Sequence, residues 1–246
     1  MRKISFFVLV VIGLTDGAHA QDDPRAVVVK AIKAQGGEEN MTKIRAGRSK
    51  LKGTLFDNGR EIPFTGEEVF ALPNQIKITL VVKTAPKGQS IVEVVDGDKG
   101  WISIDGQVKD ADADALARLK QQAYLSRVIW LTPLLNDKEY KLSMLKEIKA
   151  GDRALVGVKV ASKDQKDVSL YFDKENGLLV RLDYITKNNQ GREVTQEESF
   201  CDFVEVSGVK TPKKSVAFQD GKKLIELVVT EVEFPQSIPA KEFSKP

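Results

Sequence analysis

The chain of 246 residues contains one histidine, His19, and one cysteine, Cys201. His19 lies in a leader that we expect to be removed, so the mature chain lacks the commonest general base and metal ligand. A Ser-His-Asp triad, a Cys-His pair and a histidine-ligated zinc site are therefore excluded. A lone cysteine forms no intrachain disulfide, so stability must come from a packed core. We expect Cys201, near Phe200 and Phe203, to be a small buried apolar residue.

Long hydrophobic runs are absent beyond the N-terminus. There, Arg2 and Lys3 precede an apolar run over residues 4–14, and Ala18-His19-Ala20 has the small-x-small pattern of a cleavage site. This pattern predicts a secretory signal peptide over residues 1–20. No later run approaches the roughly 18 apolar residues of a membrane span. We therefore expect a soluble protein, periplasmic or secreted, without a transmembrane segment.

Charge of one sign does not dominate. The chain has 38 Lys and Arg against 35 Asp and Glu, and no basic block. Nucleic acid is therefore not an expected partner. No internal repeat, low-complexity tract or linker divides the chain, so we expect residues 21–246 to form a single domain and a monomer.

Apolar and polar residues alternate with a period of two through most of the chain. In residues 75–83, for example, Ile76, Ile78, Leu80 and Val82 alternate with mainly polar neighbours, the pattern of a half-buried strand. Further strands are expected at 50–56, 62–72, 91–95, 101–104, 140–148, 154–161, 168–172, 178–185, 195–206, 214–219 and 223–234. Short turns join them, most clearly Asp173–Gly177, which favours an antiparallel meander of near ten strands. A twisted sheet of that size tends to curl, so the expected class is mainly β (α+β), with a curled antiparallel sheet.

Helices are expected in two places. Asp23 followed by Pro24 opens a short helix that Gly36-Gly37 closes, and a second short helix is expected over residues 38–44. The one long helix begins near Asp112, a good N-cap, and should end or kink close to Trp130 because Pro133 disfavours helix at Thr132. Its second half is apolar on nearly every side, so protein or an apolar ligand must cover it.

The order of these segments resembles the lipoprotein localisation factor superfamily (LolA/LolB-like), in particular the exported outer-membrane lipoprotein-sorting proteins. The resemblance rests on an N-terminal helix ending in AIKAQGGEENMTKI, the helix inserted after WISIDG, the hairpin YFDKENGLLVRLDY and the closing VEFPQSIPAKEFSKP. It implies an open half-barrel whose concave face is covered by helices. It also implies binding of acyl chains there, for carriage of lipids or lipoproteins across the periplasm.

Two readings of function remain open. The first is a non-catalytic carrier or binding protein whose partner is a lipid or an acylated protein. The second is a periplasmic interaction domain of the same fold, with a filled core, no lipid cargo and an envelope protein as partner. For the first, the residues expected to line the ligand site are Ile76, Ile78, Leu80, Val82, Trp101, Trp130, Leu131, Leu178, Val180 and Leu182. Strand parity groups these residues but does not say which way each group faces.

Patterns that suggest chemistry have simpler explanations. Asp110, Asp112 and Asp114 have calcium-loop spacing, but the glycine and glutamate that complete such a loop are missing, so they indicate a helix N-terminus. Two S-x-x-K matches, at residues 49–52 and 143–146, fall in expected strands rather than on a helix. The pair Glu197-Glu198 is expected to be solvated at a strand edge. We therefore expect no enzyme, no cofactor and no metal.

Overall fold

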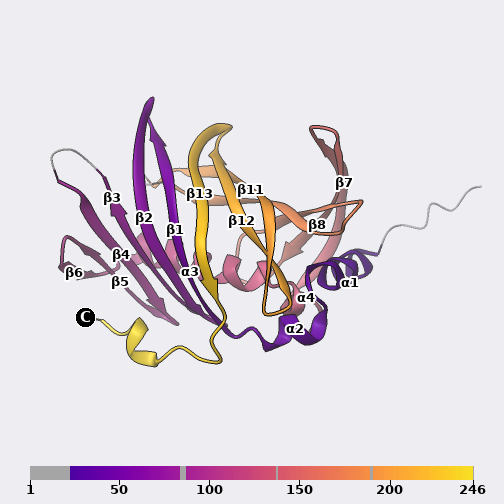
Figure 1. Ribbon diagram of the computed structural model, residues 1–246, viewed down its shortest axis with the longest axis horizontal. Helices are drawn as coiled ribbons and strands as arrows, with labels where there is room; N and C mark the ends of the chain where they lie inside the picture. Colours follow the sequence, from indigo (N-terminus) through magenta and orange to yellow (C-terminus); the bar gives the residue numbers. More distant parts are fainter. Residues whose placement is uncertain (1–22, 84–86, 137, 189–190, 246) are drawn as a thin grey trace, which may run out of the picture.

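The computed structural model describes residues 23–83, 87–136, 138–188 and 191–245 (Figure 1). Its helical elements are α1 (Pro24–Gln35), α2 (Glu38–Lys43), α3 (Ala113–Ile129), α4 (Thr132–Asn136) and the 3₁₀ helix η1 (Ala240–Phe243). Within these ranges, no helix combines the length and the apolar character needed to cross a membrane.

In the part of the chain that the structure describes, thirteen strands form one antiparallel sheet in the order β6-β5-β4-β3-β2-β1-β13-β12-β11-β10-β9-β8-β7. Their bounds are β1 (Ala46–Asp57), β2 (Arg60–Ala71), β3 (Gln75–Val82), β4 (Gln89–Asp96), β5 (Lys99–Ile104), β6 (Gln107–Asp110), β7 (Lys141–Ala150), β8 (Arg153–Ala161), β9 (Val168–Asp173), β10 (Leu179–Lys187), β11 (Glu193–Val206), β12 (Val209–Gln219) and β13 (Lys222–Glu233). The expected fold class, a curled antiparallel sheet that does not close, is confirmed.

The strand that sequence periodicity missed is β6. It has only four residues, of which Val108 is the single apolar one, and it lies at an edge of the sheet. An edge strand of this length shows no alternation to detect. The twelve other strands overlap the twelve expected ranges, and β6 adds the thirteenth.

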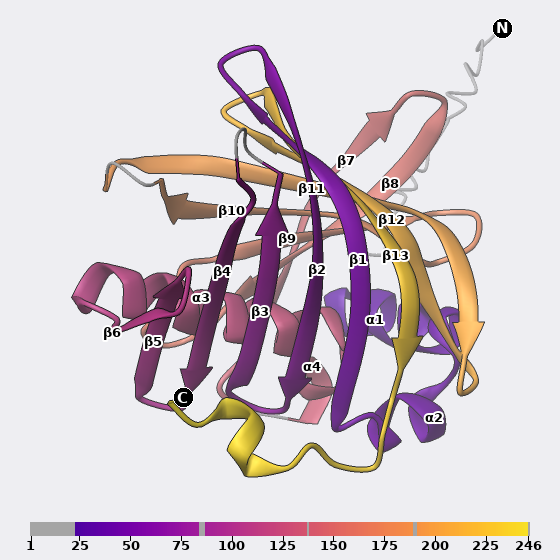
Figure 2. The same cartoon turned by 60° about the vertical axis from the view of Figure 1, so that its left-hand side comes forward.

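The strand order dictates where α3 lies. Strands β1 to β6 step outward to one edge, strands β7 to β13 step back from the other edge, and β1 pairs with β13 in the middle. The segment between β6 and β7 must therefore cross a face of the sheet. In Figure 2, α3 makes this crossing behind the strands and leads into α4.

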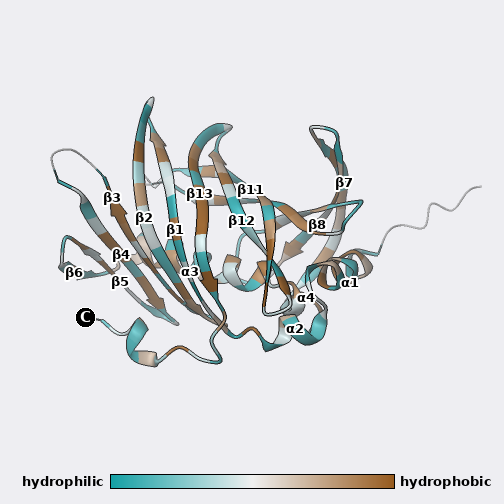
Figure 3. Cartoon of the chain, in the orientation of Figure 1, coloured by the Kyte–Doolittle hydropathy of each residue, from teal (hydrophilic) through white to brown (hydrophobic). Residues whose placement is uncertain are grey.

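The register defines the two faces of the sheet. Residues directly opposite each other on antiparallel strands point to the same side. Ile76 pairs with Phe70, and both belong to the main core with Leu119 and Ala123 of α3. We call the side that α3 covers the concave face and the other side the convex face. Along many strands in Figure 3 the hydropathy colours alternate accordingly.

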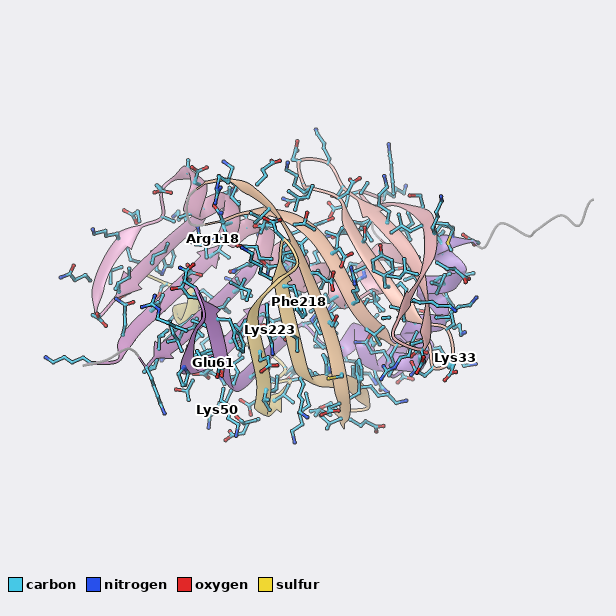
Figure 4. All side chains as sticks on the ribbon, turned by 90° about the horizontal axis from the view of Figure 1, so that it is seen from above. Lys33, Lys50, Glu61, Arg118, Phe218 and Lys223 are labelled. Carbon is cyan, nitrogen blue, oxygen red and sulfur yellow. The ribbon has the colours of Figure 1, made fainter. Side chains whose placement is uncertain are left out.

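Helix α3 is fixed at its start and covered along its length. The Asp112 carboxylate accepts a hydrogen bond from the Ala115 backbone N–H at 2.9 Å, as expected for the N-cap. Arg118, labelled in Figure 4, pairs with Glu93 of β4 at 3.1 Å. Buried residues follow one another from Ala123 to Ser126, so the prediction that the second half of this helix is covered on nearly every side is confirmed.

The end of α3 also follows the prediction. The helix stops at Ile129, Trp130 is its C-cap, and Leu131 adopts a positive φ of 59° before α4 begins. Leu131 is fully buried. The turn therefore changes the direction of the chain while keeping both side chains in the core.

The C-terminal tail covers part of the convex face. Phe243 is 0% exposed and packs with Val69, Val94 and Trp101. The next-door Glu242 accepts from Lys77 Nζ at 2.9 Å. Phe243 therefore anchors the tail to this face, and residues 240–243 form a 3₁₀ helix.

Candidate functional site: an apolar hollow beneath Trp130

A hollow of about 200 Å³ lies on the concave face where the end of α3 meets the middle of the sheet. This volume is well above the roughly 10–15 Å³ that one water requires and below the roughly 300–1,000 Å³ typical of small-molecule sites. Its lining residues come from α1, α3 and strands β1, β2, β10, β11, β12 and β13: Gln35, Ser49, Leu51, Glu68, Phe70, Ser126, Ile129, Trp130, Leu179, Glu198, Phe200, Phe203, Thr211, Pro212, Lys214, Ser215, Leu227, Val229, Val232 and Phe234.

An aromatic group forms one wall of the hollow. The Trp130 ring lies 5.7 Å from the Phe70 ring and 5.3 Å from the Phe234 ring, centroid to centroid, the latter edge-on at 82°. These are favourable aromatic geometries. Trp130 is therefore held between the sheet and the end of β13 while part of its surface borders the hollow.

Gly47 makes room for this wall. A Cβ at position 47 would lie 2.3 Å from a Phe70 ring carbon and 3.1 Å from Phe234. Any side chain there would push the rings into the hollow. The size of the hollow thus depends on a glycine in β1.

Two carboxylic acids interrupt the apolar lining. Glu68 of β2 lies opposite Ser49 of β1, and Glu198 of β11 lies opposite Ala217 of β12. Both side chains are half-buried. The loss of hydration raises the pKa of Glu68 to about 7, and the charge of Glu198 adds to the effect. Burial also raises the pKa of Glu198, against a hydrogen bond from the Ser215 hydroxyl that lowers it.

The curl of the sheet brings these two acids into one hollow. Three strands, β1, β13 and β12, separate β2 from β11. In a flat sheet such strands would lie about 19 Å apart, at roughly 4.8 Å per step. Both side chains nevertheless line the same hollow and interact electrostatically. No local pattern in the sequence predicts how strongly the sheet curves.

The four predicted ligand residues of β3 share the concave face, but none of them lines the hollow. Ile78 lies opposite Glu68, and Ile76 belongs to the main core. Leu80 and Val82 pack in a neighbouring cluster with Leu51, which does line the hollow. The group therefore extends the apolar surface of the hollow sideways, and its contact with a ligand stays a prediction.

The predicted group on β10 is split by an irregularity. The pairing of β10 with β9 shifts between Leu179 and Arg181. As a result Leu182 belongs to the main core, whereas Leu178 and Val180 pack with Leu155 in a separate cluster. Strand parity alone predicts that the three side chains lie on one face of the sheet. Because of the bulge, Leu182 packs on a different face from Leu178 and Val180. The residue of β10 that borders the hollow is Leu179.

The remaining predicted residues differ in position. Trp130 lines the hollow, and Leu131 lies in the core beside it without lining it. Trp101 packs against Phe243 on the convex face. It lies opposite Val94 of β4, and the residues of β3 and β2 in the same row as Val94 also point to the convex face. Its position removes it from this hollow.

Sequence reasoning missed Glu68 and misjudged Glu198. Glu197 is the outward member of its pair, 2.6 Å from Arg181, whereas Glu198 lines the hollow rather than a solvated edge. Parity with Phe200 was the available signal, because residues two apart on a strand share a face. Cys201, expected to be buried, is half-buried because it faces the other side of the sheet.

Comparisons with known proteins identify the fold. No protein-family model matches the chain, and no curated protein sequence matches it. Among solved structures, a LolA superfamily protein from Nitrosomonas europaea superposes with a TM-score of 0.58 at 12% identity, covering 90% of this chain and 97% of that one. A DUF1329 family protein from Desulfovibrio piger gives 0.59 at 12% identity, with 90% and 98% coverage.

A third solved structure, described as an outer membrane lipoprotein-sorting protein domain from Vibrio parahaemolyticus, gives a TM-score of 0.54 at 11% identity, with 88% and 97% coverage. At such low identities the likeness concerns the fold alone. The LolA-like resemblance inferred from the sequence is confirmed at that level: this chain has the fold of LolA superfamily proteins.

Proposed function

We propose that the chain is an exported, non-catalytic binding or carrier protein for an acyl chain, carried by a lipid or lipoprotein in the bacterial cell envelope. The observation that carries this proposal is the hollow beneath Trp130, which is lined mainly by aliphatic and aromatic side chains. Residues 1–20, the proposed signal peptide, lie outside the described residues. A single domain over residues 21–246 that acts as a monomer completes the proposal.

The chemistry of the lining suits an alkyl chain. Each methylene removed from water contributes about 0.8 kcal/mol, and Leu51, Phe70 and Leu227 are among the side chains that offer apolar contacts in the hollow. A chain longer than the hollow would continue toward Leu80 and Val82, which pack against Leu51. The shared fold of the lipoprotein-sorting domain supports the same function class.

The two tryptophans permit a direct test. Trp130 borders the hollow, while Trp101 lies on the opposite face. In a Trp101→Phe variant the emission of Trp130 should change in wavelength and intensity, and saturate, as an alkyl ligand such as dodecanol is added. In a Trp130→Phe variant the emission of Trp101 should not respond. Fluorescence titration measures both.

The opposite outcome would favour the alternative function. If Trp130 does not respond to any alkyl ligand, and organic extracts of purified protein contain no lipid by mass spectrometry, carriage is excluded. The chain would then be an envelope protein-interaction domain of the same fold.

A further inference from the structure

The polar groups that line the hollow include strong hydrogen-bond acceptors beside the hydroxyl groups of Ser49, Ser126, Thr211 and Ser215. Three elements contribute a hydrogen-bond acceptor: Gln35 at the end of α1, Glu68 on β2 and Glu198 on β11. Gln35 is 8% exposed, and its side-chain oxygen has no hydrogen-bond partner among the described residues. A buried acceptor without a donor is costly, so this oxygen favours a guest that donates a hydrogen bond.

The acids of the hollow are not neutralised within the protein. Among the described residues, none forms an ion pair or a side-chain hydrogen bond with Glu68. The neutral Ser215 hydroxyl is the hydrogen-bond partner of Glu198. The one basic residue bordering the hollow, Lys214, pairs with Asp202 and is about half exposed.

These features impose a charge preference. An anionic head group placed here would face two acids of the same sign in a setting of low dielectric constant, where repulsion is strong. A cationic donor would instead offset the burial cost of the acids and satisfy the Gln35 oxygen. The aromatic faces of Trp130 and Phe70 also favour a cation. The hollow should therefore bind amphiphiles that have the same alkyl chain with affinities that depend on the charge of the head group.

We propose that the hollow selects amphiphiles with a cationic, hydrogen-bond-donating head, an alkylammonium group, over fatty acids and other anionic amphiphiles. This proposal rests on the proposed function and specifies its ligand class. Glu68 and Glu198 would hold the ammonium group, Gln35 would accept one of its hydrogens, and the alkyl chain would lie against Leu51 and Trp130.

Three ligands of equal chain length test it: dodecylammonium, dodecanol and dodecanoate, titrated at pH 8 into the Trp101→Phe protein. We expect dodecylammonium to bind at least tenfold more tightly than dodecanoate, with dodecanol between them. In a Glu68→Gln, Glu198→Gln double variant, the preference for the ammonium should fall to near unity while the affinity for dodecanol is retained.

The matched control is a Glu67→Gln, Glu197→Gln double variant. It removes the same charge from the adjacent positions of the same strands, which face away from the hollow and pair with Arg48 and Arg181. This control should keep the ammonium preference. Circular dichroism and the urea midpoint establish that each variant is folded. The comparison of the three ligands on the protein that retains Glu68 and Glu198 does not depend on these variants.

The outcomes separate the two proposals. Equal or tighter binding of dodecanoate overturns the head-group preference and leaves the carrier function standing. Loss of the preference in the control as well as in the hollow variant overturns the assignment to Glu68 and Glu198. No response to any of the three ligands overturns the preference, and together with lipid-free organic extracts it overturns the carrier function as well.

Discussion

At the scale of single residues, the removal of the Glu68 carboxylate from water lowers the free energy of unfolding. Its folded-state pKa of about 7 exceeds the roughly 4.3 of an unfolded glutamate. Between these two values the folded chain binds the proton while the unfolded chain releases it. The contribution of Glu68 to the free energy of unfolding therefore decreases as the pH rises from about 4 to about 7.

Replacing Glu68 with glutamine should remove this contribution. Relative to the unsubstituted chain, we expect Glu68→Gln to gain on the order of 1–3 kcal/mol in free energy of unfolding between pH 4 and pH 8. Urea unfolding at several pH values measures the difference.

The control for this prediction is Glu61→Gln. Glu61 is exposed near the β1–β2 turn (Figure 4), so its substitution should change the free energy of unfolding by about 0.5 kcal/mol or less. A Glu68→Gln difference that is independent of pH would show that Glu68 is hydrated and ionised in the folded protein.

At the scale of elements, the seating of α3 on the sheet depends on Gly100 in β5. A Cβ at this position would lie 3.0 Å from a Leu116 methyl and 3.1 Å from a Leu119 methyl. Leu119 is itself fully buried. The close approach of helix and strand leaves no space for a side chain between them.

Gly100→Ala should therefore lift the first half of α3. Overpacking of this kind lowers the free energy of unfolding by roughly 1–3 kcal/mol. The urea midpoint should therefore fall, while the slope of the free energy against urea concentration stays the same. Gly88→Ala is the comparison, since the nearest atom to its added Cβ is at 3.4 Å and the position is exposed. Equal effects of the two substitutions would mean that α3 adjusts to the methyl group without loss.

At the scale of the whole molecule, other parts of the chain cover one face of the open sheet and part of the other. The concave face receives α3 because the chain must pass between the two edges, and part of the convex face receives the tail through Phe243. Glu242 joins this tail to Lys77 and Arg48. The two covers lie on opposite sides of β3 and β4.

Removing the anchor of the tail should be costly. Phe243→Ala leaves a cavity between Val69, Val94 and Trp101, and burial of such a ring is worth about 3–5 kcal/mol. We expect the thermal midpoint to fall and, in a Trp130→Phe background, the emission of Trp101 to shift to longer wavelength. Phe243→Leu should show a smaller change in both.

A Trp101 emission that stays unchanged while stability falls would contradict this arrangement. It would show that the tail covers another part of the sheet. Ligand binding at Trp130 should be unaffected by either substitution of Phe243, because the sheet separates the two sites.

Much of the architecture is encoded locally and was predicted from the sequence. Alternation with period two, the turn at Asp173–Gly177, the Asp112 cap and the break near Trp130 depend on residues close in the chain. Local patterns of this kind determine which segments become strands and helices and how strands follow one another. They also sufficed to indicate the LolA-like fold, which the solved structures confirm.

The composition of the hollow was decided by tertiary structure alone. Parity places Glu68 with Phe70, and Glu198 with Phe200, but the curl of the sheet is what joins β2 and β11 around one space. Bulges such as the one in β10 change which side chains share a face, and no sequence pattern indicates them. The tail packs against the face that contains Trp101 and forms a second core there. The sequence determined the strands because alternation is local, whereas curvature is a sum over many strands and appears only when they pack together.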